Sequence, residues 1–372
     1  MLIKEVKYSY NDIEIVPSSV SDINSRSECN IYYKDGFLPL FAAPMSTVVS
    51  MENVDTLLEN KIHPIIPRNI DYLVRVEEMK KERWVAFSLK EFQDIFCSVN
   101  NPCNCSYKVC IDCANGHMKS IFKSVKTAKQ INPKLIVMIG NIANPYTYYN
   151  VWKCGADYVR CSIGNGGGCV TSTFTGVNYP QASLIDEIAE LRRKIRDDYE
   201  IAEDKLPKVI ADGGIKGFAD INKALALGAD YVMIGSVFAS LLESPAETVD
   251  YSKGFTPISY DDLSKLYVYE NDRIEYKFKD GDKTPILAKR FYGMASNNGS
   301  KDLNNKESVA PEGCNKEYPV KYTTSAWVDK FSKYLQSCMS YCNSKTLYYF
   351  VHATDTVIVS KAAHDSVNRV VG

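Results

Sequence analysis

Short apolar runs recur through residues 38–236, and stretches that can form helices separate them. This alternation is the signature of repeated strand–helix units that build a parallel sheet. An open doubly wound sheet alternates in the same way, but eight such units with distinctive residues after many of them favour closure. The sequence therefore predicts an α/β fold, a (β/α)8 TIM barrel, with strands at residues 38–44, 63–67, 83–89, 107–114, 134–141, 156–163, 208–215 and 229–236.

The organisation of the chain follows from this repeat. The clearest barrel helix is SLIDEIAELRRKI, in which one apolar stripe is formed by Leu184, Ile185, Ile188, Leu191 and Ile195. A second helix, SAWVDKFSKYLQSCM, is expected on the barrel exterior. Residues 297–313 are polar and are expected to form a mobile flap instead of a packed element. We expect a single domain over residues 1–372, made of barrel strands at about 38–243, an insertion at 245–289, the flap at 297–313 and a C-terminal segment at 314–372.

Composition narrows the class of protein. Hydrophobic residues make up 45% of the 372 residues, which is enough to fill a large core. The net charge of −1 gives no reason to expect nucleic acid or an anionic membrane as a partner. No apolar run approaches the roughly 20 residues that span a bilayer, and MLIKEVKYSY lacks the apolar core of a secretory signal. The composition therefore predicts a cytoplasmic protein.

The 12 cysteines are scattered, and several fall inside expected strands or helices, as reduced cytosolic thiols do. Two close pairs, Cys103 with Cys105 and Cys110 with Cys113, invite a zinc interpretation. The four histidines supply no cluster that would complete such a site. A zinc site is therefore not expected.

The chemically distinctive residues fall at the ends of the expected strands. A (β/α)8 barrel carries its active site at the carboxyl ends of its strands and in the loops that follow. The residues at these ends are Asp112 to Gly116 after the fourth strand, Gly140 and Asn141 after the fifth, the Cys169 loop after the sixth, Asp212, Gly213 and Gly214 after the seventh, and Gly235 and Ser236 after the eighth. This shared location predicts one site.

Two motifs carry most of the chemistry. SIGNGGGCVTSTFTGVNYPQ, residues 162–181, presents Cys169 on a glycine-rich loop. Glycines permit positive φ and close approach to a ligand, and a thiolate can form a covalent adduct with an electrophilic carbon. In ADGGI, the Asp212 carboxylate can accept two hydroxyl donors. A buried structural cysteine and an ordinary Asp-Gly-Gly turn are the alternatives.

The Cys169 loop resembles the catalytic loop of the IMP dehydrogenase and GMP reductase family. The matching residues are Ile163, Gly164, Gly166, Cys169, Thr171, Gly176, Val177, Tyr179, Pro180 and Gln181. Its TGVxYPQ form, and DCANGH at 112–117, are more similar to GMP reductases than to IMP dehydrogenases. DIEIVPSSVSDINSRSE resembles the opening segment of the family, so the resemblance covers residues 8–340.

The resemblance implies roles for individual residues. Cys169 would attack C2 of the purine, and Thr171 with Glu312 would handle the departing ammonia. The purine nucleotide, GMP or IMP, would contact Met45, Asp212, Gly213, Gly214, Gly235, Ser236, Tyr292, Gly293, Met294 and Ser296. Met45 can equally be barrel core, and Glu312 can equally be an exposed flap residue.

The resemblance also implies a nicotinamide cofactor, a cation and an assembly. NADPH would lie beside Asp112, Ala114, Asn115 and Gly116, although a strand-end aspartate before an Asn-Gly turn is the alternative. Potassium would bind the backbone carbonyls of Gly164, Gly166 and Cys169. The subunits would form a homotetramer.

The direction of the reaction depends on the flap. IMP dehydrogenases hydrolyse the adduct with an arginine–tyrosine pair on a long flap, but residues 295–313 contain no arginine. The regulatory domain pair of most IMP dehydrogenases is also missing. Both absences favour GMP reductase. Three departures from the family pattern, at Ser46, Gly167 and Val309, leave other interpretations open: an IMP dehydrogenase that uses NAD, a catalytically silent nucleotide-binding paralogue, and a phosphate-binding barrel of another family.

Overall fold

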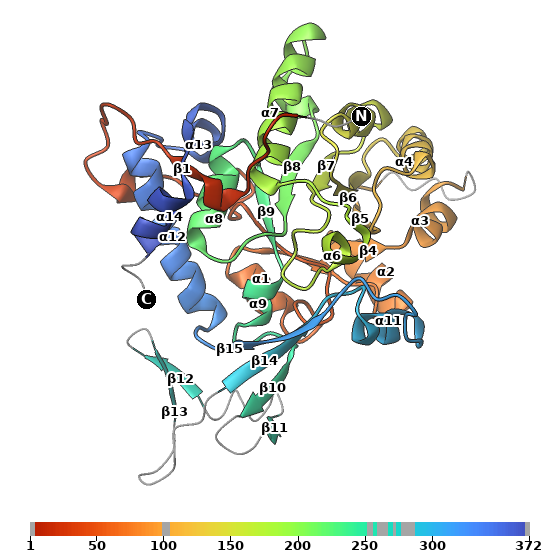
Figure 1. Ribbon diagram of the computed structural model, residues 1–372. Helices are drawn as coiled ribbons and strands as arrows, with labels where there is room; N and C mark the ends of the chain where they lie inside the picture. Colours follow the sequence, from red (N-terminus) through yellow and green to blue (C-terminus); the bar gives the residue numbers. More distant parts are fainter. Residues whose placement is uncertain are drawn as a thin grey trace.

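The computed structural model describes residues 4–98, 105–250, 256–258, 267–270, 273–276 and 287–368. Eight parallel strands close into a barrel in the order in which they occur along the chain, and the first strand pairs with the last (Figure 1). The predicted (β/α)8 barrel is therefore confirmed. Its strands are β2 (Leu40–Ala42), β3 (His63–Ile66), β4 (Trp84–Phe87), β5 (Lys108–Asp112), β6 (Ile136–Ile142), β7 (Tyr158–Cys161), β8 (Lys208–Asp212) and β9 (Tyr231–Ile234).

The strands are shorter than the sequence predicts at their carboxyl ends. The run at 208–215, for example, leaves the sheet after Asp212 because Gly213 and Gly214 adopt φ angles of +89° and +77°. This left-handed conformation is open to glycine and ends a strand. The residues that the sequence places at strand ends therefore lie in loops above the barrel.

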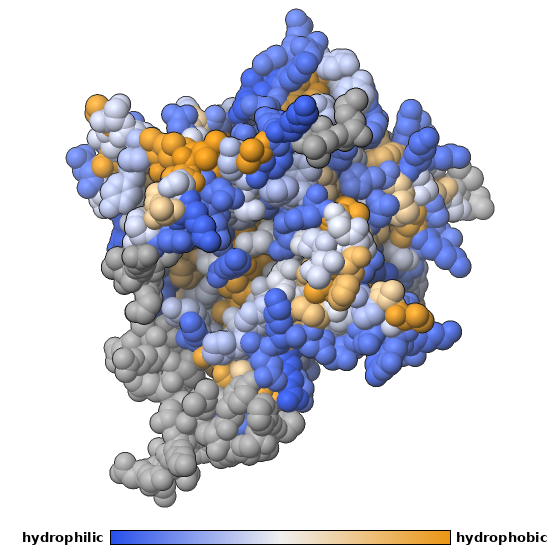
Figure 2. Space-filling view, viewed as in Figure 1, coloured by the Kyte–Doolittle hydropathy of each residue, from blue (hydrophilic) through white to orange (hydrophobic). Residues whose placement is uncertain are grey.

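Helices surround the barrel, as the alternation predicts (Figure 1). On the longest barrel helix, four of the five predicted stripe residues are buried and Leu191 is half-buried. The opposite face is hydrophilic and solvent-exposed (Figure 2). The helices are α1 (Val54–Glu59), α2 (Tyr72–Lys80), α3 (Leu89–Phe96), α4 (Lys119–Ile131), α5 (Thr147–Cys154), α6 (Thr171–Thr175), α7 (Gln181–Asp198), α8 (Phe218–Ala226) and α9 (Ser236–Ala239).

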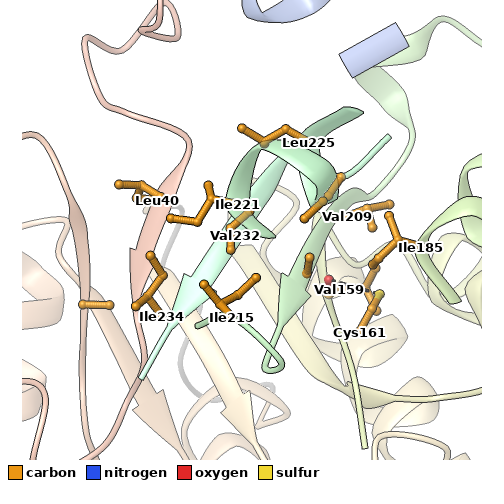
Figure 3. Packing of buried hydrophobic residues seen from close by; sticks show 14 of the residues in the cluster. Leu40, Val159, Cys161, Ile185, Val209, Ile215, Ile221, Leu225, Val232 and Ile234 are labelled. Carbon is orange, nitrogen blue, oxygen red and sulfur yellow. Dashed lines mark hydrogen bonds between the residues drawn. The ribbon is translucent and has the colours of Figure 1, made fainter. Parts of the chain in front are cut away.

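The core has two parts because successive strand residues point to opposite faces. Val159, Val209 and Val232 point outward and pack with Ile185 and Ile221 of the surrounding helices (Figure 3). The barrel interior is filled by the alternate residues, which include Phe41, Ile65, Trp84, Cys110, Met138, Ile210, Tyr231 and Met233. The same alternation places Asp112, Gly140, Arg160, Asp212 and Gly235 on the inward side, above this apolar filling.

The region after the barrel contains an antiparallel sheet with the order β11-β10-β14-β15. Its strands are β10 (Glu247–Asp250), β11 (Thr256–Ile258), β14 (Leu287–Tyr292) and β15 (Asn315–Pro319); β12 (Tyr267–Glu270) and β13 (Arg273–Tyr276) pair separately. The expected insertion at 245–289 thus includes sheet strands, and β14 crosses its expected end. The rest of the insertion lies outside the described residues.

The expectation of a flap without packed structure at 297–313 is wrong in its first half. Residues Asn297–Asn304 form helix α11, and the side chain of Ser296 accepts a hydrogen bond from the backbone amide of Gly299. Serine is a preferred residue at a helix N-terminus. A Cβ on Gly299 would lie 2.5 Å from the Met294 carbonyl oxygen, so glycine allows the first turn of α11 to pack closely.

The C-terminal segment packs on the barrel exterior. The predicted exterior helix is present as α12 (Thr324–Tyr341), and its Trp327 and Phe331 contact Phe218 of α8. Helices α13 (Leu347–Ala353) and α14 (Lys361–Asn368) follow. Strand β16 (Thr356–Ile358) pairs with β1 (Ile13–Ile15). Short 3-10 helices span Tyr10–Asp12, Arg26–Glu28 and Glu203–Lys205.

Two further findings bear on the composition argument. In the described part of the chain, no helix combines the length and apolar character needed to cross a membrane. Cys105 is disulfide-bonded, so the expectation of reduced thiols is wrong at that position. The other cysteines among the described residues are free.

Candidate active site

A cavity of about 480 Å³ opens at the carboxyl ends of the barrel strands. Its walls come from the ends of β5, β7, β8 and β9, the Cys169 loop, the segment after β14, and α11. Among its lining residues are Met45, Asp112, Ala114, Gly164, Gly166, Cys169, Thr171, Asp212, Gly213, Gly214, Gly235, Ser236, Gly293, Met294 and Glu312. The structure thus brings most of the predicted site residues to one place.

Cys169, Thr171 and Glu312 form a chain of hydrogen bonds. The Cys169 Sγ lies 3.2 Å from the Thr171 Oγ1, which donates to the Glu312 Oε2 at 2.6 Å. The backbone fixes this arrangement, since the amide of Val170 donates to the Glu312 carbonyl at 2.8 Å and Cys169 is bridged to Gly313. A proton can therefore pass from the thiol through the hydroxyl to the carboxylate.

Glycines allow the Cys169 loop to pack against the segment after β14. A Cβ on Gly168 would lie 2.6 Å from the Phe291 Cε1, and one on Gly293 would overlap the Gly168 carbonyl oxygen. The other end of the loop is held by Asn165, whose amide donates to the Tyr179 carbonyl at 2.9 Å. The loop is thus fixed at both ends around the thiol.

The floor of the cavity is a charged network centred on Arg160. Its guanidinium donates to Asp112 Oδ1 at 2.8 Å and to Asp212 Oδ2 at 3.1 Å. Arg68 donates to the second oxygen of Asp112 at 3.1 Å, and the Asn141 amide donates to Asp212 Oδ2 at 2.7 Å. Two carboxylates that would otherwise repel each other are thereby held together.

The network sets the charge of its members. Burial by itself would raise the pKa of Asp112, but the charges of Arg160 and Arg68 outweigh this effect and lower its pKa below the ordinary value. The pKa of Arg160 is raised well above its ordinary value because the neighbouring carboxylates outweigh the cost of burial. Both groups are therefore charged at neutral pH.

Sequence reasoning did not include Arg68, Arg160 or Asn141 in the site. The signal for Arg160 was present, because a charged residue stands inside the apolar strand run ADYVRCSI. A buried charge requires a partner, and the inward alternation points Arg160 toward Asp112 and Asp212. Arg68 and Asn141 had no comparable signal beyond their positions after expected strands.

Glycines also bring the nucleotide loops together. A Cβ on Gly213 would lie 3.1 Å from the Gly166 amide, and one on Gly235 would lie 3.3 Å from the Met45 Sδ. A Cβ on Gly167 would lie 3.0 Å from the Ser236 Oγ. The glycine at position 167 therefore brings the Cys169 loop close to Ser236, at the start of α9.

Four predicted site residues do not line the cavity. The Tyr292 hydroxyl donates to Asp302 at 2.6 Å, and the buried Ser296 caps α11. Asn115 accepts from the backbone amide of His117, and Gly116 is buried with its amide bonded to the Asn141 carbonyl. For these residues the structure shows a role in holding loops and helix ends.

The three carbonyls expected to bind potassium lie in the same loop. The Gly164 oxygen accepts from the Ser172 hydroxyl at 3.2 Å, and the Gly166 oxygen accepts from the Cys169 amide at 3.0 Å. Both carbonyls have a second lone pair for a ligand.

The barrel and this cavity define a (β/α)8 protein with a thiol-containing site at the carboxyl ends of its strands. Residues 104–368 match the family model described as IMP dehydrogenase / GMP reductase domain, and the chain belongs to this family of purine-nucleotide oxidoreductases.

Two kinds of curated relatives match the chain. An inosine-5'-monophosphate dehydrogenase of Chlorobaculum tepidum is 34% identical over 260 residues, which are 68% of this chain and 45% of the relative. A GMP reductase of Staphylococcus saprophyticus is 29% identical over 282 residues, which are 73% of this chain and 82% of the relative. A GMP reductase of Oceanobacillus iheyensis is 29% identical over 77% of this chain and 83% of its own length. The chain thus spans less than half of the dehydrogenase relative and most of the two reductases.

Proposed function

We propose that this protein is a GMP reductase, which converts GMP and NADPH to IMP, NADP⁺ and ammonia. The observation that carries the proposal is the hydrogen-bonded chain from Cys169 through Thr171 to Glu312. In this reaction the thiolate adds to purine C2, the 2-amino group leaves as ammonia, and a hydride then replaces the thiolate at C2. NADPH supplies the hydride.

The protein residues move the protons of this reaction. The thiol proton of Cys169 passes to Thr171, and the Thr171 proton passes to Glu312, so that a thiolate forms beside a protonated carboxyl group. The same path in reverse delivers a proton to the departing amine. Glu312 therefore acts first as a base and then as an acid.

The rest of the cavity would hold the nucleotide. All three bonds from Arg160 and Asn141 go to Oδ2 of Asp212, and none of them uses Oδ1, which suits it to accept from the ribose hydroxyls. Gly213, Gly214, Gly235 and Ser236 lie on the same side of the cavity, where backbone amides and a hydroxyl can contact phosphate. Gly293 and Met294 would face the purine.

The cofactor side is proposed on fewer contacts. Asp112 and Ala114 line the cavity, and both oxygens of Asp112 are held by arginines. This fixes the carboxylate beside the expected nicotinamide position. Asn115 and Gly116 would act by shaping the turn that carries Ala114.

IMP dehydrogenase is the second candidate, because the Chlorobaculum tepidum relative has the higher identity, 34% against 29%. A dehydrogenase must activate water to hydrolyse the cysteine adduct. Residues 295–313 offer no arginine for that step, whereas Thr171 and Glu312 supply the proton path that loss of ammonia needs. This difference favours the reductase.

The test is to mix the purified protein with each substrate pair and follow the absorbance of the reduced nicotinamide. We expect NADPH to be consumed with GMP, together with release of IMP and ammonia, and Cys169→Ser to serve as the inactive control. Reduction of NAD in the presence of IMP, without consumption of NADPH with GMP, would assign the dehydrogenase instead. Binding of GMP without turnover in either direction would indicate a silent paralogue.

Potassium is tested in the same assay. The proposed carbonyl site predicts a higher rate in potassium than in a large organic cation, which the loop cannot enclose. Equal rates in the two salts would remove the cation from the proposal.

A further inference from the structure

Helix α11 forms one wall of the cavity. Ser300, Leu303 and Asn304 line it, and their i, i+3, i+4 spacing places them on one face of the helix. The first turn is attached through the Ser296 cap and the close contact of Gly299 with Met294. The position of the wall then depends on what holds the other end of the helix.

Near that end, one oxygen of Asp302 accepts two hydrogen bonds. The Ser46 Oγ donates to Oδ2 at 2.7 Å, and the Tyr292 hydroxyl donates to the same oxygen at 2.6 Å. The two hydroxyl groups are themselves 3.3 Å apart. Ser46 follows β2 and Tyr292 ends β14, so this contact joins three segments that are distant in sequence.

The position of Asp302 in its own helix gives an independent reason for this contact. Asp302 lies in the last turn of α11, where the helix dipole disfavours a negative charge. The helix alone therefore gains nothing from a carboxylate at this position. The bond also affects Tyr292, because burial and the Asp302 carboxylate together raise the pKa of Tyr292 to about 12. The hydroxyl thus keeps its proton and remains a donor.

We propose that Ser46, Tyr292 and Asp302 form a latch that holds α11 closed against the nucleotide cavity. Asp302 is then a positioning residue, which acts on the ligand through the α11 face formed by Ser300, Leu303 and Asn304. The inference rests on the proposed function only in naming a purine nucleotide as the ligand. The latch itself is a property of the free protein.

The experiment compares four variants in two assays. Asp302→Ala removes the latch. The exchange Ser46→Asp with Asp302→Ser moves the carboxylate across the 3.3 Å gap to the other side of the contact, still facing Tyr292. Glu307→Gln is the matched control, because it removes an exposed ion pair with Lys301 of α11 and leaves the latch intact. Asp302→Asn keeps an oxygen acceptor without the charge.

The first assay is hydrogen exchange of the α11 amides in the free protein. We expect exchange about tenfold faster in Asp302→Ala, which corresponds to about 1.4 kcal/mol of local opening. Asp302→Asn should lie between Asp302→Ala and the wild type, and Glu307→Gln should match the wild type. The double variant should restore protection relative to Asp302→Ala. Equal exchange in Asp302→Ala and Glu307→Gln, or a double variant no better than Asp302→Ala, would overturn the latch.

The second assay is calorimetric binding of GMP and IMP. Asp302→Ala should bind the nucleotide about tenfold more weakly, with the double variant recovering part of the loss. Tighter binding by Asp302→Ala would mean that the carboxylate competes with the ligand and would also overturn the latch. If the wild type binds neither nucleotide, the proposed function fails, and the exchange assay still decides whether the latch exists.

Discussion

At the scale of single residues, Arg160 connects the two halves of the proposed site. Its guanidinium bonds to Asp212, assigned to the nucleotide, and to Asp112, assigned to the cofactor. Because Arg160 is only 8% exposed, these bonds form where water competes weakly. The geometry of one binding half therefore depends on the other.

Cys169→Ser should lower turnover by orders of magnitude and leave nucleotide binding nearly unchanged. A serine hydroxyl is far less ionised than a thiol near neutral pH, and it keeps the size of the side chain. Steady-state rates and calorimetric titration with GMP check the two halves of this prediction. Turnover within about tenfold of the wild type would remove covalent catalysis from the account.

Lys289 predicts a pH dependence of stability. Its side chain is 1% exposed and donates to the carbonyls of Ser244 and Ala246. Burial lowers its pKa from 10.5 to about 7, although the charge of Glu243 partly opposes this shift. Between these pH values the unfolded chain binds a proton that the folded protein releases, so the free energy of unfolding should rise with pH.

Urea unfolding at pH 7 and pH 9 checks this sign. From pH 7 to pH 9 the wild type should gain about 2 kcal/mol relative to Lys289→Met, since one unit of pKa shift is worth about 1.4 kcal/mol. Lys316→Met, an exposed change on the neighbouring strand β15, should follow the wild type. A wild type that loses stability relative to Lys289→Met over this range would contradict the assigned shift.

At the scale of elements, close backbone packing sets the positions of the loops. Gly140 at the end of β6 leaves room for Arg160 of the neighbouring strand β7, since a Cβ there would lie 2.5 Å from the Arg160 Cβ and 2.9 Å from the Arg160 carbonyl oxygen. Gly168 and Gly299 allow equally close contacts for the Cys169 loop and α11. These glycines are required by space at a contact between elements.

Gly140→Ala should therefore destabilise the fold and weaken ligand binding together. Overpacking of a buried contact typically costs about 1–3 kcal/mol, and the displaced Arg160 would no longer bridge its two carboxylates. Gly217→Ala is the control, because a Cβ at Gly217 would meet nothing within 4 Å. Chemical denaturation and nucleotide titration of both variants decide the matter, and equal losses in the two would argue against the contact.

At the scale of the whole molecule, the two ends of the chain meet on the barrel exterior. Strand β1 near the start pairs with β16 near the end, in register from Ile13 with Ile358 to Ile15 with Thr356. A hydrophobic region lies near β1 in Figure 2. Exposed side chains of these segments include Val16, Val357 and Ile358, with 38%, 48% and 58% of their surface accessible.

We expect the subunits to assemble as a homotetramer, as the family resemblance implies. Exposed apolar side chains of this kind are commonly covered by subunit contacts. Sedimentation at assay concentrations, with activity measured on the same sample, checks the prediction. A fully active monomer would exclude both the tetramer and any cofactor site shared between subunits.

The sequence alone determined the barrel and the main parts of the site. Alternating apolar runs report which side chains point inward, and strand ends in a parallel barrel share one edge, so Asp112, Cys169 and Asp212 could be placed together without coordinates. Both signals are local periodicities, which the chain carries in its own order. The same periodicity predicted the long helices α7 and α12.

Only the tertiary structure decided the contacts between segments that are distant in sequence. The bonds of Arg160 to two strands, of Thr171 to Glu312 and of Asp302 to Ser46 depend on side-chain reach across the closed barrel. No local pattern encodes such distances. Helix α11 was missed for a similar reason, because it is held by a cap, a close glycine contact and long-range hydrogen bonds, whereas its polar sequence lacks an apolar stripe.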